Sequence, residues 1–196
     1  MMLISQSFEV KQPIDAVWKF FDDIPQVAAS IPGANLSKEV SKDKYEGGVV
    51  VSAGPVKLEF DGVAEVKSRD NAKRILVLDA SGSDKKGRGA ASVLLTAALN
   101  QIPGGTKVDL SMDLTISGAA ANYGRGLVAD VTAVLVNTAT VNMEARMDAI
   151  SKGLDPNSVG GAKAASGLSI GINAFKRATG RVLARFFLPY KPVARR

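Results

Sequence analysis

The sequence contains neither cysteine nor histidine among its 196 residues. Without cysteine the chain can form no disulfide bond, no thiolate metal site and no cysteine nucleophile. Without histidine it lacks imidazole metal ligands and the commonest general base at neutral pH. A serine–lysine pair is the one remaining route to an activated serine, and no spacing indicates it. We therefore predict that the protein is not an enzyme, with general acid–base catalysis by a carboxylate as the alternative.

Long apolar runs are also missing. The N-terminal stretch MMLISQSFEVKQ has no apolar core of signal-peptide length. No run approaches the roughly 18 apolar residues expected of a bilayer-spanning helix. A hydrophobic content of 46% with 22% charged residues is ordinary for a globular protein. We expect a cytoplasmic protein that is soluble or peripheral at the inner face of the cell membrane.

Acidic residues are almost absent from the last quarter of the chain. Up to position 150 the sequence has 16 basic against 18 acidic residues, a net charge of −2. After it come nine basic residues and Asp155 alone, a net charge of +8. This asymmetry is typical of a basic tail with an anionic partner. We predict a domain over 1–150, a flexible linker rich in Gly, Ser and Ala over 151–168, and a basic amphipathic tail over 169–196.

Within the domain, alternating apolar and polar residues predict β-strands over 3–10, 44–54, 55–68, 72–82, 89–99 and 105–118. Short helical segments are expected over 12–24, with Pro13 in the first turn, and over 25–30. One long helix over 122–150 is predicted from the spacing of Leu127, Val131, Val134, Thr138, Val141 and Ala145. The order predicts an α+β fold in which a curved antiparallel sheet of six to seven strands wraps around the long C-terminal helix.

Five short motifs lie in register along this domain. They are Pro13–x4–Trp18, Ile31-Pro32-Gly33, Gly54-Pro55-Val56 running to Phe60-Asp61-Gly62, Thr106 at the start of the last strand, and Ser117-Gly118-x-x-Ala121-x-Tyr123-Gly124 before the long helix. In this order they resemble the CoxG family, the carbon-monoxide-dehydrogenase G-subunit family of the START-like, SRPBCC helix-grip superfamily. The resemblance covers about residues 1–150. Its consensus usually has Phe where this chain has Tyr123.

The resemblance implies a hydrophobic cavity between the sheet and the long helix, often a site for a lipid-like or aromatic ligand. From the residues alone, apolar stripes are more often a filled core. Small residues at Gly47, Ala53 and Gly62 leave room in the sheet. The candidate ligand-binding residues are Trp18, Val49, Val51, Leu58, Phe60, Met112, Leu114, Tyr123, Val131, Val134 and Leu135.

Two charged segments have simpler explanations than a site. Asp61 alternates with Phe60, which places it on the outer, solvated face of its strand. Lys85-Lys86-x-Arg88 is interpreted as an ordinary charged turn between strands. No metal site is predicted.

The tail combines positive charge with aromatic residues. On a helix, Arg177, Arg181 and Arg185 form one row, and Ile172, Phe175, Thr179, Val182 and Phe186 form an apolar stripe. This pattern is typical of a helix that lies on an anionic membrane surface. The predicted membrane-binding residues are Phe175, Lys176, Arg177, Arg181, Val182, Arg185, Phe186 and Phe187. A solvated tail and a groove on a partner protein are the alternatives; nucleic acid is not expected, because the domain offers no basic face.

Together these features predict a non-catalytic accessory protein that binds a hydrophobic ligand. By the resemblance, it recruits a CO-dehydrogenase-like molybdenum hydroxylase to the cytoplasmic membrane. Such an enzyme must pass electrons to a membrane pool, so a quinone is the expected ligand. The alternatives are an enzyme that uses the helix-grip cavity and a ligand-free protein–protein adaptor.

Overall fold

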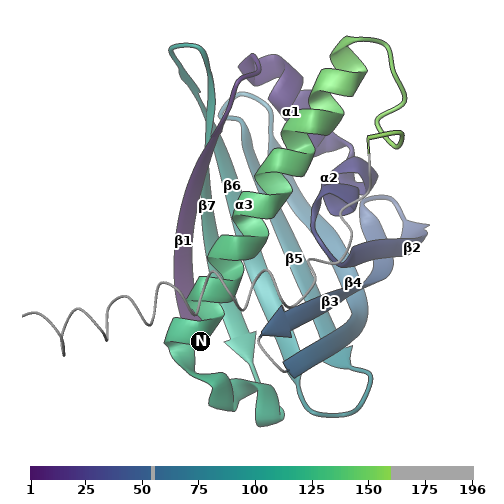
Figure 1. Ribbon diagram of the computed structural model, residues 1–196, viewed down its shortest axis with the longest axis vertical. Helices are drawn as coiled ribbons and strands as arrows, with labels where there is room; N and C mark the ends of the chain where they lie inside the picture. The colour runs from purple at the N-terminus through teal and green to yellow at the C-terminus, as the bar shows by residue number, and fades with distance from the viewer. Residues whose placement is uncertain (54–55, 160–196) are drawn as a thin grey trace, which may run out of the picture.

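The computed structural model describes residues 1–53 and 56–159. It contains one seven-stranded antiparallel sheet in the order β1-β7-β6-β5-β4-β3-β2, with three α-helices on one of its faces (Figure 1). The elements are β1 (Met2–Val10), α1 (Ile14–Asp22), α2 (Ile24–Ser30), β2 (Ala34–Ser41), β3 (Lys44–Ala53), β4 (Val56–Asp70), β5 (Ile75–Asp84), β6 (Ala90–Ile102), β7 (Gly105–Ile116), the 3-10 helix η1 (Gly118–Tyr123) and α3 (Gly124–Ser151). This is the predicted α+β arrangement.

The strand order shows why the first and last strands lie together. Strands β2 to β7 each pair with the next along the chain, and β1 adds to the free edge of β7. The sequence did not predict β2, because it is polar and mostly exposed and its pairing with β3 is interrupted by register shifts. With β2 included, the sheet reaches the upper end of the predicted strand number.

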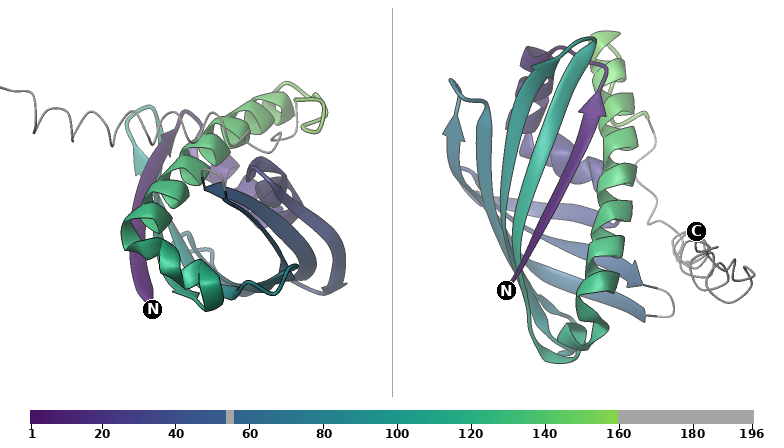
Figure 2. Two further views of the ribbon diagram at one scale, coloured as in Figure 1. Left: turned by 60° about the horizontal axis from the view of Figure 1, so that its bottom comes forward. Right: turned by 90° about the vertical axis from the view of Figure 1, so that its left-hand side faces the viewer.

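The sheet bends sharply around its inner face, the face that carries the helices (Figure 2). Three glycines on neighbouring strands, Gly47, Gly62 and Gly82, lie in register across the bend. A Cβ atom built on Gly62 would lie 1.9 Å from the carbonyl oxygen of Ser81, and one on Gly47 would lie 2.3 Å from that of Asn35. The glycines therefore allow close backbone approach at the bend. Gly47 and Gly62, two of the small residues expected to leave room for a ligand, thus lie where the sheet bends.

Two short helices and the end of α3 close one end of the fold. Pro13 lies just before α1, as its N-cap, and not in its first turn as predicted. Asp23 caps α2, accepting a hydrogen bond at Oδ1 from the backbone N–H of Gln26 at 3.2 Å. The core here is packed from α1, the adjoining ends of β6 and β7, and α3; Val17, Ala97 and Val108 are fully buried.

Helix α3 crosses the sheet diagonally, from the start of β1 towards α2 (Figure 1). Its buried residues are Ala139, Met143, Arg146, Met147 and Ala149. The Leu/Val stripe that predicted the helix is a different face: Val141 is 65% exposed and Leu127 is 36% exposed. The prediction of a long helix is correct, but its most regular apolar stripe is not its buried face.

Helix α3 is also long and apolar enough to cross a membrane, by length and composition alone. The expectation that no segment reaches this length was therefore wrong. Within the domain the helix is held by polar contacts: the Nδ2 of Asn142 donates to the carbonyl oxygen of Ser30 at 2.8 Å, and Glu144 accepts from the backbone N–H of Lys11 at 3.2 Å. These contacts fix α3 against α2 and the end of β1.

Candidate functional site

The inner face of the sheet is apolar across strands β3 to β7. Strand pairing places Val49 of β3 opposite Phe60 of β4, and Val51 opposite Leu58. The same alternation directs the apolar side chains of the neighbouring strands to this face, namely Ala64, Val66, Leu78, Ala80, Val93, Leu95, Met112 and Leu114. The structure thus joins the predicted ligand-binding residues of β3 and β4 into one patch.

This patch remains partly open to solvent. Val49, Val51, Leu58 and Phe60 are only half-buried, although they point to the side that carries the helices. Helix α3 packs mainly on β1 and α2, with smaller contacts to α1 and η1. The N-terminal half of α3 therefore leaves β3 and β4 incompletely covered. We call this half-buried inner surface of β3 and β4 the inner groove.

The predicted residues of α3 lie in its N-terminal half. Val131, Val134 and Leu135 are all half-buried. They follow the helical flank that leads to Asn142, which bonds α2. The opposite flank leads to Glu144 and the end of β1. The flank with Val131 is therefore turned away from the end of β1.

Trp18 lies outside the groove. It is 8% exposed and belongs to the packed core at α1. Its Nε1 donates to Oδ1 of Asn71 at 3.0 Å, and the guanidinium of Arg74 lies 5.7 Å from the ring centroid. These contacts tie α1 to the β4–β5 turn, which is a structural role.

The remaining predicted residues fall in three parts of the chain. Met112 is buried and Leu114 half-buried on β7, further along the inner face from the β3–β4 patch. Tyr123 is the last residue of η1. The predicted membrane-binding residues of the tail, from Phe175 to Phe187, lie outside the residues that the structure describes.

One charged pair lies at the end of the inner face, where sequence reasoning placed none. Asp84 is opposite Phe60 across the β4–β5 pair, and its side chain is fully buried. It accepts hydrogen bonds from Arg88 at Nε (2.8 Å) and Nη2 (2.7 Å), and from the backbone N–H groups of Glu59 and Lys86. The Arg88 bonds hold the pKa of Asp84 well below its usual range, against the opposing effect of burial. The alternation of β5, extended to its last residue, could have placed Asp84 inside.

Arg88 shows that the segment 85–88 is more than a solvated turn. Besides binding Asp84, its Nη2 donates to the carbonyl oxygen of Lys57 at 2.8 Å. The pair therefore fastens the β5–β6 turn to β4. The pair lies at the end of the inner groove beside Phe60. Both oxygens of the Asp84 carboxylate accept hydrogen bonds from Arg88.

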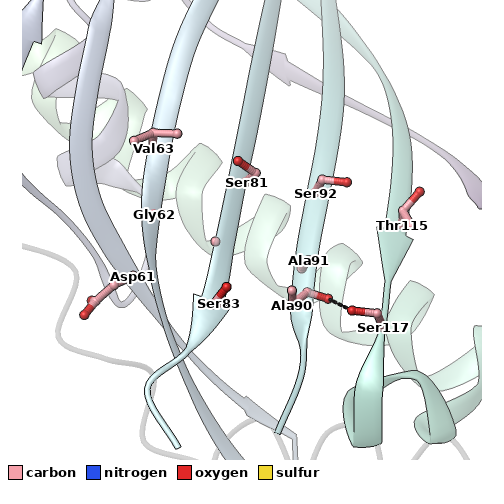
Figure 3. A pocket seen from close by; sticks show the side chains of 11 residues that line it. Asp61, Gly62, Val63, Ser81, Ser83, Ala90, Ala91, Ser92, Thr115 and Ser117 are labelled. Atoms are coloured by element: carbon pink, nitrogen blue, oxygen red, sulfur yellow. Dashed lines mark hydrogen bonds between the residues drawn. The ribbon is translucent and has the colours of Figure 1, made fainter. Parts of the chain in front are cut away.

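The outer face of the sheet has a different character. A shallow depression of about 400 Å³ lies on this face. It is lined by small side chains such as Ser81, Ser92 and Thr115 (Figure 3). Asp61 lies here, 61% exposed and 3.2 Å from Nζ of Lys85, as the alternation predicted. Within residues 1–53 and 56–159, no group of three or more acidic side chains is placed to hold a metal ion.

The part of the chain that matches a known protein family is the domain from β1 to α3. The model of the family described as the carbon monoxide dehydrogenase G-subunit (CoxG) matches residues 7–148. The chain belongs to the CoxG family. Membership supports an accessory role associated with carbon monoxide dehydrogenase. No curated protein matches the chain.

Solved structures show the same fold at low sequence identity. A conserved protein from Geobacillus kaustophilus is 20% identical with a TM-score of 0.67, covering 75% of this chain and 95% of that one. A Thermus thermophilus protein is 14% identical with a TM-score of 0.54, covering 76% and 99%. The Zhui aromatase/cyclase from a Streptomyces species is 15% identical with a TM-score of 0.51, covering 74% and 94%. These similarities confirm the START-like helix-grip fold of this CoxG protein.

Proposed function

We propose that this CoxG protein is a non-catalytic accessory factor that binds a hydrophobic ligand in the inner groove and brings a CO-dehydrogenase-like molybdenum hydroxylase to the cytoplasmic membrane. The observation that carries the proposal is the half-buried apolar patch of Val49, Val51, Leu58 and Phe60. Apolar side chains that point inward but stay partly wet gain free energy when a ligand covers them, about 25 cal/mol per Å². A lipid-like molecule fits such a surface.

A quinone is the ligand that the proposal names. The hydroxylase must release electrons to a membrane pool, and a quinone is apolar enough for the groove. Native mass spectrometry of protein purified from its own host tests this directly, with a bound quinone as the expected result. A reproducible absence of any bound small molecule would favour the ligand-free adaptor instead.

The membrane part of the proposal rests on the tail sequence and its charge of +8. Near an anionic leaflet each basic residue contributes about 1 kcal/mol. Replacing Arg177, Arg181 and Arg185 together by Gln should therefore cost about 3 kcal/mol, roughly a 150-fold loss of affinity for anionic vesicles. Co-sedimentation of the full chain with vesicles containing phosphatidylserine measures this loss.

A matched control removes the same charge from the folded domain. Lys57, Lys67 and Lys107 lie on the outer face of the sheet, each beside a carboxylate and each well exposed. Their joint replacement by Gln should leave vesicle binding almost unchanged, since surface ion pairs contribute little. Equal losses in the two triple variants, or no vesicle binding by the parent chain, would contradict the membrane proposal.

The partner part of the proposal rests on family membership. Vesicle co-sedimentation of a CO-dehydrogenase-like molybdenum hydroxylase should depend on the presence of this chain. The hydroxylase should sediment with anionic vesicles when the parent chain is added. It should remain in solution when the Arg177, Arg181 and Arg185 triple variant replaces it. Sedimentation that is independent of the chain would contradict recruitment.

The second candidate function is an enzyme of the helix-grip fold, which the similarity to an aromatase/cyclase raises at the level of fold alone. A catalytic groove would need a carboxylate or phenol free to exchange a proton. Among the described inner-face residues, Asp84 is held ionised by Arg88, and burial raises the pKa of the Tyr45 phenol above its usual value. This supports the non-catalytic proposal.

A further inference from the structure

Helix α3 carries a second apolar stripe that the domain does not bury. We call Leu127, Val131, Val134, Thr138, Val141 and Ala145 the free flank of α3. Val141 is 65% exposed, Ala145 is exposed, and the other four range from half-buried to 36% exposed. Their spacing of three and four residues places them along one side of the helix, about 27 Å long from Leu127 to Ala145. No member is charged.

An exposed side of a helix is normally polar. The free flank is distinct from the packed face, whose residues Ala139, Met143 and Met147 are buried. Its exposed members, Leu127, Val141 and Ala145, form an apolar surface on the domain. Such a surface indicates a contact that the described residues do not supply.

We propose that the tail of this same chain docks on the free flank of α3. The predicted tail stripe, from Ile172 to Phe186, would be about 21 Å long as a helix, close to the length of the flank. The two surfaces are alike in chemistry: one presents Leu and Val, the other Phe, Ile and Val. A helix laid along the flank with its stripe inward keeps its arginine row in water.

The chain connecting the two surfaces is long enough for this contact. The segment after α3 is held back onto the domain, since Nη1 of Arg146 donates to Oδ1 of Asn157 at 3.1 Å. From position 160 to position 171 there are 12 residues, which reach about 40 Å when extended. Tethering on such a linker gives the tail a local concentration in the millimolar range, so a weak contact suffices.

Docking would make the tail a switch, an inference that rests on the membrane part of the proposed function. On α3 the phenylalanines of the tail are hidden from water and from lipid. On an anionic membrane they insert, and the free flank is uncovered. The two states compete for one apolar stripe, so membrane binding releases the free flank.

The test uses thiol accessibility in the full chain. Because the natural chain has no cysteine, V141C introduces its sole thiol at a site that is already 65% exposed. A water-soluble maleimide should modify this thiol at least 10-fold more slowly in the parent tail background than in one carrying F175S, V182S and F186S. The three serine substitutions preserve the net charge. L94C, on the outer face of the sheet and 46% exposed, should react equally in both backgrounds.

Vesicles and dilution separate the competing explanations. Anionic vesicles should raise the V141C rate to that of the serine background. Equal V141C rates in the two tail backgrounds without vesicles would overturn the docking proposal. So would protection that grows with protein concentration, which marks a second copy, or protection that appears only with vesicles, which marks the bilayer. Slow modification in solution together with no vesicle binding would uphold docking and overturn the membrane proposal. A145C provides a second thiol on the same flank.

Discussion

Phe60 offers the sharpest test of the inner groove, because it is central to the patch and only half-buried. It lies opposite Val49 on the inner face of β4. A phenylalanine side chain presents about 200 Å², of which a ligand could cover roughly a quarter here. At 25 cal/mol per Å² this is about 1.3 kcal/mol, and the matching surface of the ligand roughly doubles it. F60A should therefore raise the Kd of a groove ligand about 10- to 70-fold.

The assay can use the natural fluorophore of the chain. Trp18 is the sole tryptophan, and its contacts to Asn71 and Arg74 lie away from Phe60. Quenching of its fluorescence by a short-chain ubiquinone analogue gives the Kd for parent and variant. F60A should lower the free energy of unfolding by less than the 3–5 kcal/mol lost when a fully buried Phe is truncated. A thermal unfolding curve of the variant gives a temperature at which it is folded, and binding is measured there.

The control is V63A on the same strand. Val63 is 37% exposed on the outer face, so its truncation alters β4 without touching the groove. V63A should bind the quinone analogue like the parent. If F60A binds as tightly as the parent, or if V63A weakens binding as much as F60A, the inner groove is not the ligand site.

Three further outcomes test the fold around the groove. G62A should destabilise the domain by about 1–3 kcal/mol, because its Cβ meets the Ser81 backbone. G126A, with open space around it, should be neutral or stabilising by up to about 0.5 kcal/mol. Urea unfolding of the two variants measures both effects. D84N should lower the melting temperature at pH 7. Because the folded-state pKa of Asp84 lies below its ordinary value of 3.8, its contribution is present above that pH and lost as the pH falls towards the folded pKa, so the melting temperatures of parent and D84N should converge in acid. R146A should also lower the melting temperature, since it removes a buried side chain that bonds Gln26 at 2.7 Å and Asn157 at 3.1 Å.

The strands of the groove were predictable because each has one clear apolar side. Alternation alone placed Val49, Leu58 and Phe60 inward and Asp61 outward, as the pairing of β3, β4 and β5 confirms. It could not show the bend, because the register of Gly47 with Gly62 and Gly82 depends on pairing between strands. The open state of the patch was also out of reach, since it depends on where α3 crosses the sheet.

Helix α3 is a different case: the helix was predicted correctly, but its most regular apolar stripe is not its buried side. Apolar residues occur on more than one side of it, so periodicity could not decide which apolar side meets the domain. Polar contacts made the choice: Asn142 binds Ser30, and Arg146 binds Gln26. Neither polar residue belongs to the regular stripe. Trp18 packs in the core at α1, which is as common for an aromatic residue in a motif as a ligand contact is.

The two apolar sides of α3 explain why the helix has the composition of a membrane span without being held as one. One side packs on the domain. There Glu144 accepts a hydrogen bond from the backbone N–H of Lys11, and Arg146 donates one to Gln26. The other side, the free flank, has no use in a domain that ends at α3. A helix-grip domain needs its long helix to be apolar on one side only. The second side therefore indicates a function that involves another apolar surface, and the sequence of the tail offers one on a short tether.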